Sequence, residues 1–130
     1  MLKPGVSGEA VMVVAKGNTA IEVGSGSVPV FATPMLVALM ENAAINALKE
    51  KLPEGQTTVG SKVNIAHTAA TPLGMTVTAH AELVELDGRR LLFNVTAVDD
   101  SGPVGEGTHE RFIVDLAKFL AKVDQKKAGA

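Results

Sequence analysis

Residues 33–48 read TPMLVALMENAAINAL, and this stretch decides the fold. The residues from Met35 to Lys51 are mostly good helix formers, with Pro34 at a first helical position where its missing N–H costs nothing. Thr33 is a plausible N-cap, and Leu52-Pro53-Glu54-Gly55 should stop the helix. Because apolar residues lie on nearly every side of this helix, we expect it to be buried within the protein.

Segments that alternate between apolar and polar residues follow this helix, as half-buried strands do. The pattern predicts strands over residues 57–69, 75–86, 89–98 and 104–114, with a hairpin at Asp87-Gly88 and a C-terminal helix over 116–126. Before the helix, residues 8–16 should form a strand and 18–23 a second, short one. On 57–69 one face should carry Val59, Val63, Ile65 and His67; on 75–86 one face should carry Met75, Val77, Ala79, Ala81 and Leu83.

One fold satisfies both patterns. Consecutive antiparallel strands make a curled sheet with one solvated face, and a helix that is apolar all round needs a sheet wrapped about it. We therefore expect an α+β hot-dog fold, a long central helix wrapped by a curled antiparallel sheet, as a single domain over residues 1–130.

Composition excludes several function classes. The chain has no Cys, which removes disulfides, a Cys nucleophile and thiolate metal sites. A formal net charge of -2 and 3% aromatic residues argue against nucleic-acid binding. No run of apolar residues is long enough to span a membrane, and the first eight residues do not resemble a signal peptide, so we expect a cytoplasmic protein.

Two residues break the apolar patterns on facing elements. Glu41 is the only charged residue inside the helix, with no Lys or Arg three or four residues away. A buried, unpaired carboxylate is costly and is retained mainly where it works, although Glu41 could instead reach solvent or pair with a distant Arg. His67 belongs to the strand face that should meet the helix, where a structural histidine is the alternative. Together the two groups would form an acid–base or polarising pair.

Other candidates are more ambiguous. Thr33 serves as a helix cap or sits among N–H groups suited to an oxyanion, and its Cα should lie roughly 12 Å from that of Glu41 along the axis. His109 and Arg111 share one strand face with Glu110 on the other, which favours a surface ladder. Gly60, like Gly105 and Gly107, suggests a bulge or a close backbone approach.

The chain resembles the fluoroacetyl-CoA thioesterase family of hot-dog proteins. The resemblance runs from about Val30 to Lys127 and rests on five segments: Phe31-Ala32-Thr33, Leu39-Met40-Glu41, His67-Thr68-Ala69-Ala70-Thr71-Pro72, Gly88-Arg89-Arg90-Leu91 and Gly107-Thr108-His109-Glu110-Arg111. It implies an acyl-CoA thioesterase that acts as a homodimer, with its sites at the subunit interface and no metal or organic cofactor. Whether dimers pair into tetramers stays open.

The resemblance also implies roles for particular residues. The catalytic Thr, Glu and His of the family match Thr33, Glu41 and His67, and its substrate-contacting Gly and Arg match Gly60 and Arg111. Arg111 would hold Glu41 or contact the substrate. Glu41 would either attack the thioester or activate a water, and His67 would polarise the carbonyl or protonate the leaving thiolate.

One segment departs from the family pattern. The family's founding enzyme has an aromatic, proline-rich lid before the catalytic Thr, whereas residues 24–30 read GSGSVPV here. Another short or medium acyl group is therefore at least as well supported as fluoroacetyl. Two other functions remain open on the same fold: a non-hydrolytic acyl-CoA binding or sensing module, and a hydratase or dehydratase, which usually has an Asp-x-x-x-x-His arrangement not seen near this helix.

Overall fold

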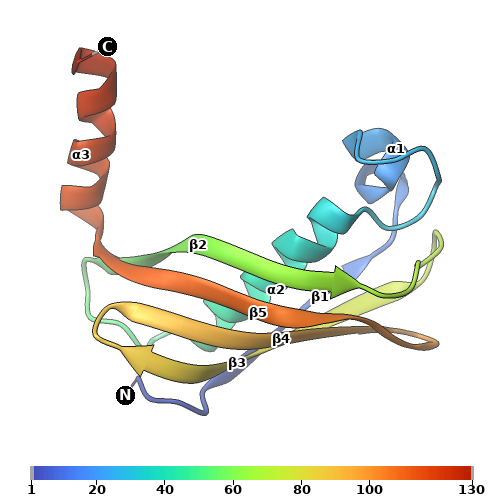
Figure 1. Cartoon of the computed structure of the whole chain (residues 1–130), viewed down its shortest axis with the longest axis horizontal. Helices are drawn as coiled ribbons and strands as arrows, with labels where there is room; N and C mark the ends of the chain where they lie inside the picture. Colours follow the sequence, from blue (N-terminus) through green and yellow to red (C-terminus); the bar gives the residue numbers. More distant parts are fainter. Residues whose placement is uncertain (1, 130) are drawn as a thin grey trace.

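A computed structural model describes residues 2–129 and shows one curled sheet around one long helix (Figure 1). The elements are β1 (Ser7–Val13), the 3-10 helix η1 (Lys16–Asn18), α1 (Ala20–Val23), α2 (Thr33–Ala47), β2 (Gln56–His67), β3 (Thr76–Asp87), β4 (Arg90–Asp99), β5 (Gly102–Asp115) and α3 (Leu116–Gly129). The predicted α+β hot-dog architecture is confirmed.

The sheet is antiparallel throughout, with the strand order β1-β3-β4-β5-β2. Helix α2 lies along one face of the sheet and packs mainly against β1 and β3 (Figure 1). Gly8 permits this close packing, because a Cβ there would collide with the backbone of Ala43 and Ala47 in α2. Strand β2 pairs only with β5, so its other edge is free among the described residues.

The core joins the buried side of α2 to the inner face of the sheet. The predicted alternation in β3 is confirmed, since Val77, Ala79, Ala81 and Leu83 are all fully buried. They meet fully or almost fully buried helix side chains, namely Leu36, Leu39, Met40, Ala43 and Ala44. Full burial of a side chain as large as leucine contributes about 1.5–3 kcal/mol, so this layer holds α2 firmly in place.

The predicted short strand at residues 18–23 is wrong, because this segment forms η1 and the single turn α1. Val23 donates to the carbonyl of Thr19 and Gly24 donates to that of Ala20, which closes the turn. Gly24 has a φ of 87°, the left-handed conformation that commonly ends a helix. Burial of Ala20 outweighs the strand preference of the exposed Ile21 and Val23.

Helix α2 ends at Ala47 rather than at the predicted Lys51. The N–H of Leu48 donates to the carbonyl of Ile45, a tight bond that ends the α-helical ladder. Glu50 then adopts a positive φ of 62°. The chain therefore turns before it reaches Pro53.

A β-bulge at Ser61 corrects the predicted face of Val59. The pairing of β2 with β5 shifts register between Gly60 and Lys62, and Ser61 instead donates to the main-chain oxygen and side chain of Glu110. Gly60 faces α2 before the bulge, while Ile65 packs against the core after it. Val59, one residue before Gly60, is therefore on the opposite face from Ile65.

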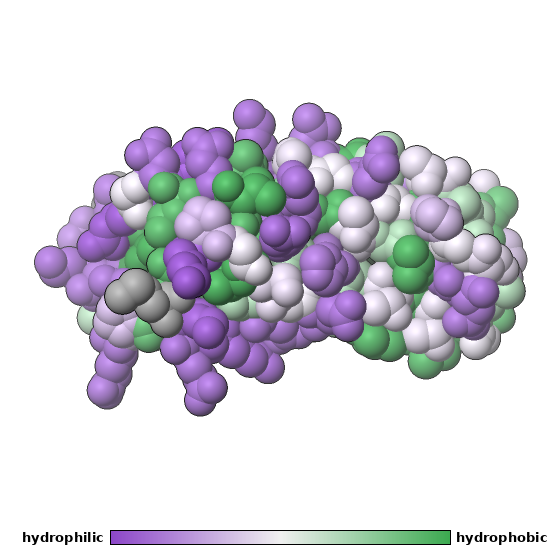
Figure 2. Space-filling view, turned by 90° about the horizontal axis from the view of Figure 1, so that it is seen from below, coloured by the Kyte–Doolittle hydropathy of each residue, from purple (hydrophilic) through white to green (hydrophobic). Residues whose placement is uncertain are grey.

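Helix α3 extends away from the sheet and contains no buried residue (Figure 1). On the face that Figure 2 shows, strongly hydrophilic residues are most frequent at the end where α3 lies, around a group of hydrophobic residues. The opposite end, where α1 and the following loop lie, shows more residues of intermediate hydropathy (Figures 1 and 2). Within residues 2–129, no helix is long and apolar enough to cross a membrane.

Candidate active site

Thr33 begins α2, but it does not cap the helix as expected. Ala32 occupies the N-cap position, and no side chain there bonds to the helix. The Thr33 hydroxyl instead lies 2.7 Å from Nδ1 of His67, a strong hydrogen bond. The extended backbone of Ala32 moves Thr33 one residue into the helix and turns its hydroxyl toward the sheet.

His67 is the last residue of β2 and is only partly exposed. Burial lowers the pKa of its imidazole below the ordinary value, so the ring is neutral near pH 7. Thr33 occupies Nδ1, while Nε2 is buried and has no hydrogen-bond partner in the described chain. A buried imidazole nitrogen without a partner is costly, and a substrate atom would satisfy it.

A pocket of about 350 Å³ adjoins this pair. Its walls come from α1, the loop after α1 and residues 67–70, and both Thr33 and His67 line it. Val28 and Val30 contribute apolar wall from the loop. The pocket is large enough for a small acyl group beside the imidazole.

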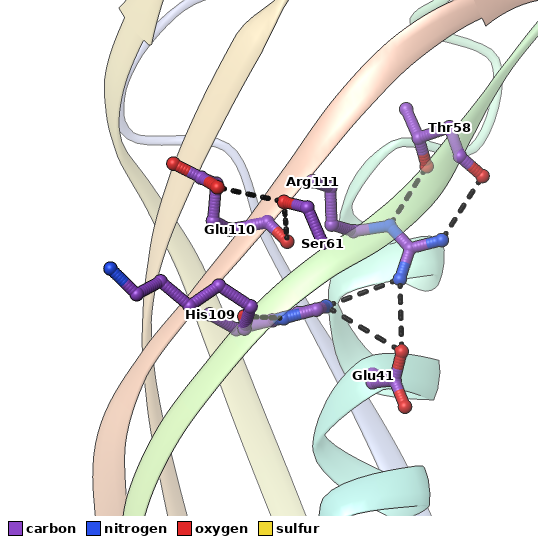
Figure 3. A network of polar contacts seen from close by, with 7 residues as sticks. Glu41, Thr58, Ser61, His109, Glu110 and Arg111 are labelled. Atoms are coloured by element: carbon purple, nitrogen blue, oxygen red, sulfur yellow. Dashed lines mark hydrogen bonds and ion pairs between the residues drawn. The ribbon is translucent and has the colours of Figure 1, made fainter.

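Glu41 lies in the middle of α2, with its side chain 37% exposed. It is not unpaired: its Oε2 is 3.5 Å from Nη1 of Arg111 and 4.0 Å from Nε2 of His109 (Figure 3). The ion-pair partner is Arg111 of β5, 70 residues along the chain, and His109 of the same strand lies beside the pair. Helical spacing could not reveal Arg111. Of the readings open from the sequence, an unpaired carboxylate is therefore wrong, and pairing with a distant Arg is the one that the structure shows.

The expected surface ladder at residues 109–111 is also wrong, although its alternation is right. His109 and Arg111 are 1% and 5% exposed and face α2. Glu110 points the other way, where its carboxylate accepts from Arg90 at 2.6 Å and from Ser61 at 2.8 Å. The solvated face of β5 therefore carries the cross-strand contacts of Glu110, and its buried face carries Arg111, whose positive charge pairs with Glu41.

Arg111 is held from two sides. Its Nε donates to Thr58 Oγ1 at 2.9 Å and its Nη2 to the Thr58 carbonyl at 3.1 Å (Figure 3). Its Nη1 is directed toward Glu41. Burial lowers the pKa of Arg111 and the charge of Glu41 counteracts this, but an arginine remains protonated in either case.

Gly60 makes room for this ion pair. A Cβ at Gly60 would lie 2.6 Å from Oε2 of Glu41 and 3.3 Å from Nη1 of Arg111. Any side chain there would displace the carboxylate. Thr58 and His109 are the residues of this cluster that sequence reasoning did not place in the site. The shared strand face of His109 and Arg111 was the signal for one of them, whereas Thr58 carried no signal.

The five predicted residues thus form two groups. One is Thr33 with His67, and the other is Glu41 with Gly60 and Arg111. Within residues 2–129, no hydrogen bond or ion pair joins the two groups. Eight residues of helix separate Thr33 from Glu41, or roughly 12 Å at 1.5 Å per residue.

Known proteins share this sequence and architecture. The profile of the fluoroacetyl-CoA-specific thioesterase family matches residues 14–117. A fluoroacetyl-CoA thioesterase of Streptantibioticus cattleyicolor is 48% identical over 97 residues, which are 75% of this chain and 70% of that protein. The solved structure of the fluoroacetyl-CoA thioesterase FlK has a TM-score of 0.91 at 39% identity, covering 97% of this chain and 98% of that one.

A Thermus thermophilus protein of the thioesterase superfamily also has a TM-score of 0.91, at 29% identity, covering 98% of this chain and 95% of that one. The family profile spans both groups of predicted site residues, and the structural match extends over nearly the whole chain. The chain therefore belongs to the fluoroacetyl-CoA-specific thioesterase family.

Proposed function

We propose that this protein hydrolyses a short or medium acyl-CoA thioester with Thr33, Glu41 and His67 as its catalytic residues. Membership of a thioesterase family identifies the chain as a thioester hydrolase that acts on acyl-CoA, as predicted. The observation that carries the residue assignment is the Thr33–His67 pair, with a buried and unpartnered Nε2 at the edge of a pocket.

His67 acts on the thioester through Nε2. When the Thr33 hydroxyl donates to Nδ1, the neutral ring carries its proton on Nε2 and donates a hydrogen bond from it to the thioester carbonyl or the departing thiolate. The lowered pKa keeps the imidazole neutral at physiological pH. Thr33 selects this tautomer with its hydroxyl proton. Its backbone N–H is left to stabilise developing negative charge on the carbonyl oxygen, because Pro34 has no N–H and those of Met35 and Leu36 donate to the carbonyl of Ala32.

Glu41 supplies the attack on the carbonyl carbon. By one route its carboxylate attacks directly, releases the CoA thiolate and forms a mixed anhydride that water then hydrolyses. By the other route it removes a proton from a water that attacks. The products are the free acid and CoA in both cases. Arg111 holds the Glu41 carboxylate in place, and Gly60 leaves the space that the carboxylate occupies. Detection of a covalent acyl-enzyme by rapid-quench mass spectrometry would identify the first route.

The complete site forms between two copies of the chain. Among residues 2–129, no strand pairs with the outer edge of β2, so its backbone groups can pair with a second copy, which supports a homodimer. The roughly 12 Å between Thr33 and Glu41 supports a site shared by two protomers, because reacting groups must come within hydrogen-bond reach. The residues that act need no metal or organic cofactor, since carboxylate, imidazole and hydroxyl supply the chemistry.

The acyl group contacts the loop of residues 24–30. This loop lines the pocket with small and aliphatic residues, and its sequence GSGSVPV has no aromatic ring. Phe31, directly after the loop, also lines the pocket, but the aliphatic residues of the loop bind an acyl chain by burial and do not select a fluorine atom by specific contact. We therefore expect turnover of acetyl- to butyryl-CoA at rates comparable with fluoroacetyl-CoA.

The test is release of free thiol from a panel of acetyl-, fluoroacetyl-, butyryl-, benzoyl- and phenylacetyl-CoA, followed with a thiol-reactive dye. The chain has no Cys and gives no background. Glu41→Gln should lower turnover by about two orders of magnitude or more while acyl-CoA still binds. Glu82→Gln, on an exposed part of β3, is the matched control and should retain activity. Binding without thiol release by the wild-type protein would instead support the sensing module.

A further inference from the structure

His109 is a buried polar residue that the mechanism above does not use. Its ring lies between β5 and α2, 1% exposed, and stacks on Phe93 with ring centroids 6.4 Å apart. Nδ1 is 2.9 Å from the carbonyl oxygen of Lys62. Because a carbonyl oxygen only accepts, Nδ1 carries the proton and donates it.

This bond decides what the other nitrogen does. Nε2 lies 3.1 Å from Nη1 of Arg111, and a guanidinium only donates. His109 Nε2 must therefore be unprotonated and accept this hydrogen bond, so the ring is neutral. Burial lowers the pKa of His109, and the positive charge of Arg111 lowers it further, in agreement with this state.

The same Nη1 reaches Glu41 at 3.5 Å. Thr58 fixes the Nε and Nη2 side of the guanidinium, while His109 and Glu41 share Nη1. The acceptor on His109 is therefore a third anchor of the planar guanidinium, and it holds the Nη1 side that faces Glu41 (Figure 3). Without it, Nη1 would keep only the longer contact with Glu41.

We propose that His109 is a positioning residue of the thioesterase site: its Nε2 accepts from Arg111 and directs that guanidinium onto the Glu41 carboxylate. The proposal rests on the role of Glu41 proposed above. It explains why a neutral histidine is buried beside an arginine, where an apolar residue would avoid the cost of burying a polar ring. The bulge at Ser61 contributes as well, because it brings the Lys62 carbonyl to Nδ1.

The experiment compares two substitutions at one position. His109→Leu removes the acceptor at similar volume, and His109→Gln restores an acceptor oxygen near the place of Nε2. With the best acyl-CoA of the panel, the Leu variant should lose about tenfold or more in kcat with KM changed less than about threefold, and the Gln variant should recover most of kcat. His80→Leu, on β3, which β4 separates from β5, lies outside the site; it is the matched control and should keep wild-type kcat.

Two kinetic results would overturn the proposal. One is wild-type kcat in His109→Leu, and the other is an equal loss in the Leu and Gln variants, which would show a packing role. Glu41→Gln is measured in parallel. If it is inactive while His109→Leu is normal, only the role of His109 fails. If it is active, the role of Glu41 itself fails.

A second measurement needs no substitution. Nitrogen-15 chemical shifts of the His109 ring in the folded wild-type protein report which nitrogen carries the proton. We expect the tautomer with Nδ1 protonated and Nε2 bare at pH 7. A proton on Nε2 would contradict the proposal even if the Leu variant failed to fold.

Discussion

Activity should return when two inactive variants are mixed, if Glu41 and His67 of one site come from different protomers. The perturbation is a pair of single variants, Glu41→Gln and His67→Ala, each expected to be inactive in isolation. Thr33 holds His67 at the start of α2, whereas Glu41 is eight residues further along the helix. The roughly 12 Å between the Cα atoms of Thr33 and Glu41 along the axis is the reason to expect that a second protomer completes the site.

The magnitude follows from counting sites in a two-fold dimer. Random mixing makes about half of the dimers heterodimers, and each heterodimer has one intact site and one doubly defective site. The mixture should therefore reach about a quarter of wild-type turnover per chain. The assay is thiol release after the two variants are unfolded together and refolded, with differently tagged chains so that heterodimers can be counted by native mass spectrometry.

Heterodimers that form but recover no activity would place Glu41 and His67 of one site on the same chain. The matched control mixes Glu41→Gln with Arg111→Gln. Both changes lie in the cluster that one chain builds by itself, so this heterodimer should contain no intact site and should show no recovery.

Three further outcomes are expected. Thr33→Val removes the hydrogen bond to His67 and should lower turnover about 10- to 100-fold, whereas Thr33→Ser should retain activity. The free energy of unfolding of Thr33→Val in urea should change by less than about 1 kcal/mol, because Thr33 is not the helix cap, and a large loss of stability in this variant would contradict the assignment. Gly60→Ala should lower kcat more than it raises KM, since its Cβ would displace the Glu41 carboxylate, whereas Gly17→Ala, in open space, should have no effect. Because the pKa values of His67 and His109 are lowered in the folded state, the unfolded chain binds more protons in acid. The free energy of unfolding should therefore fall as the pH drops below the ordinary histidine pKa of about 6.5. An unchanged urea midpoint between about pH 7.5 and 5.5 would contradict the burial of neutral rings.

Local patterns in the sequence determined the architecture. The apolar run from Met35 to Leu48 predicted a helix packed against a sheet, although only one side of it is buried and Ile45 is 45% exposed. The alternation in residues 75–86 assigned one face of β3 to the core. Both patterns depend on side-chain periods of helix and strand, which do not change with tertiary context. Glu41 and His67 were found for the same reason, because each interrupts a pattern that predicts burial.

Only the tertiary structure decided how the site residues are paired. The bulge at Ser61 changed which β2 residues face the helix, and the hydroxyl of Thr33 bonds to a histidine 34 residues away instead of capping its own helix. Arg111, 70 residues from Glu41, neutralises a carboxylate that looked unpaired. Sequence spacing reports which face a residue occupies along one element. Which residue it meets depends on strand register and on the packing of helix against sheet, and these are set by the whole chain at once.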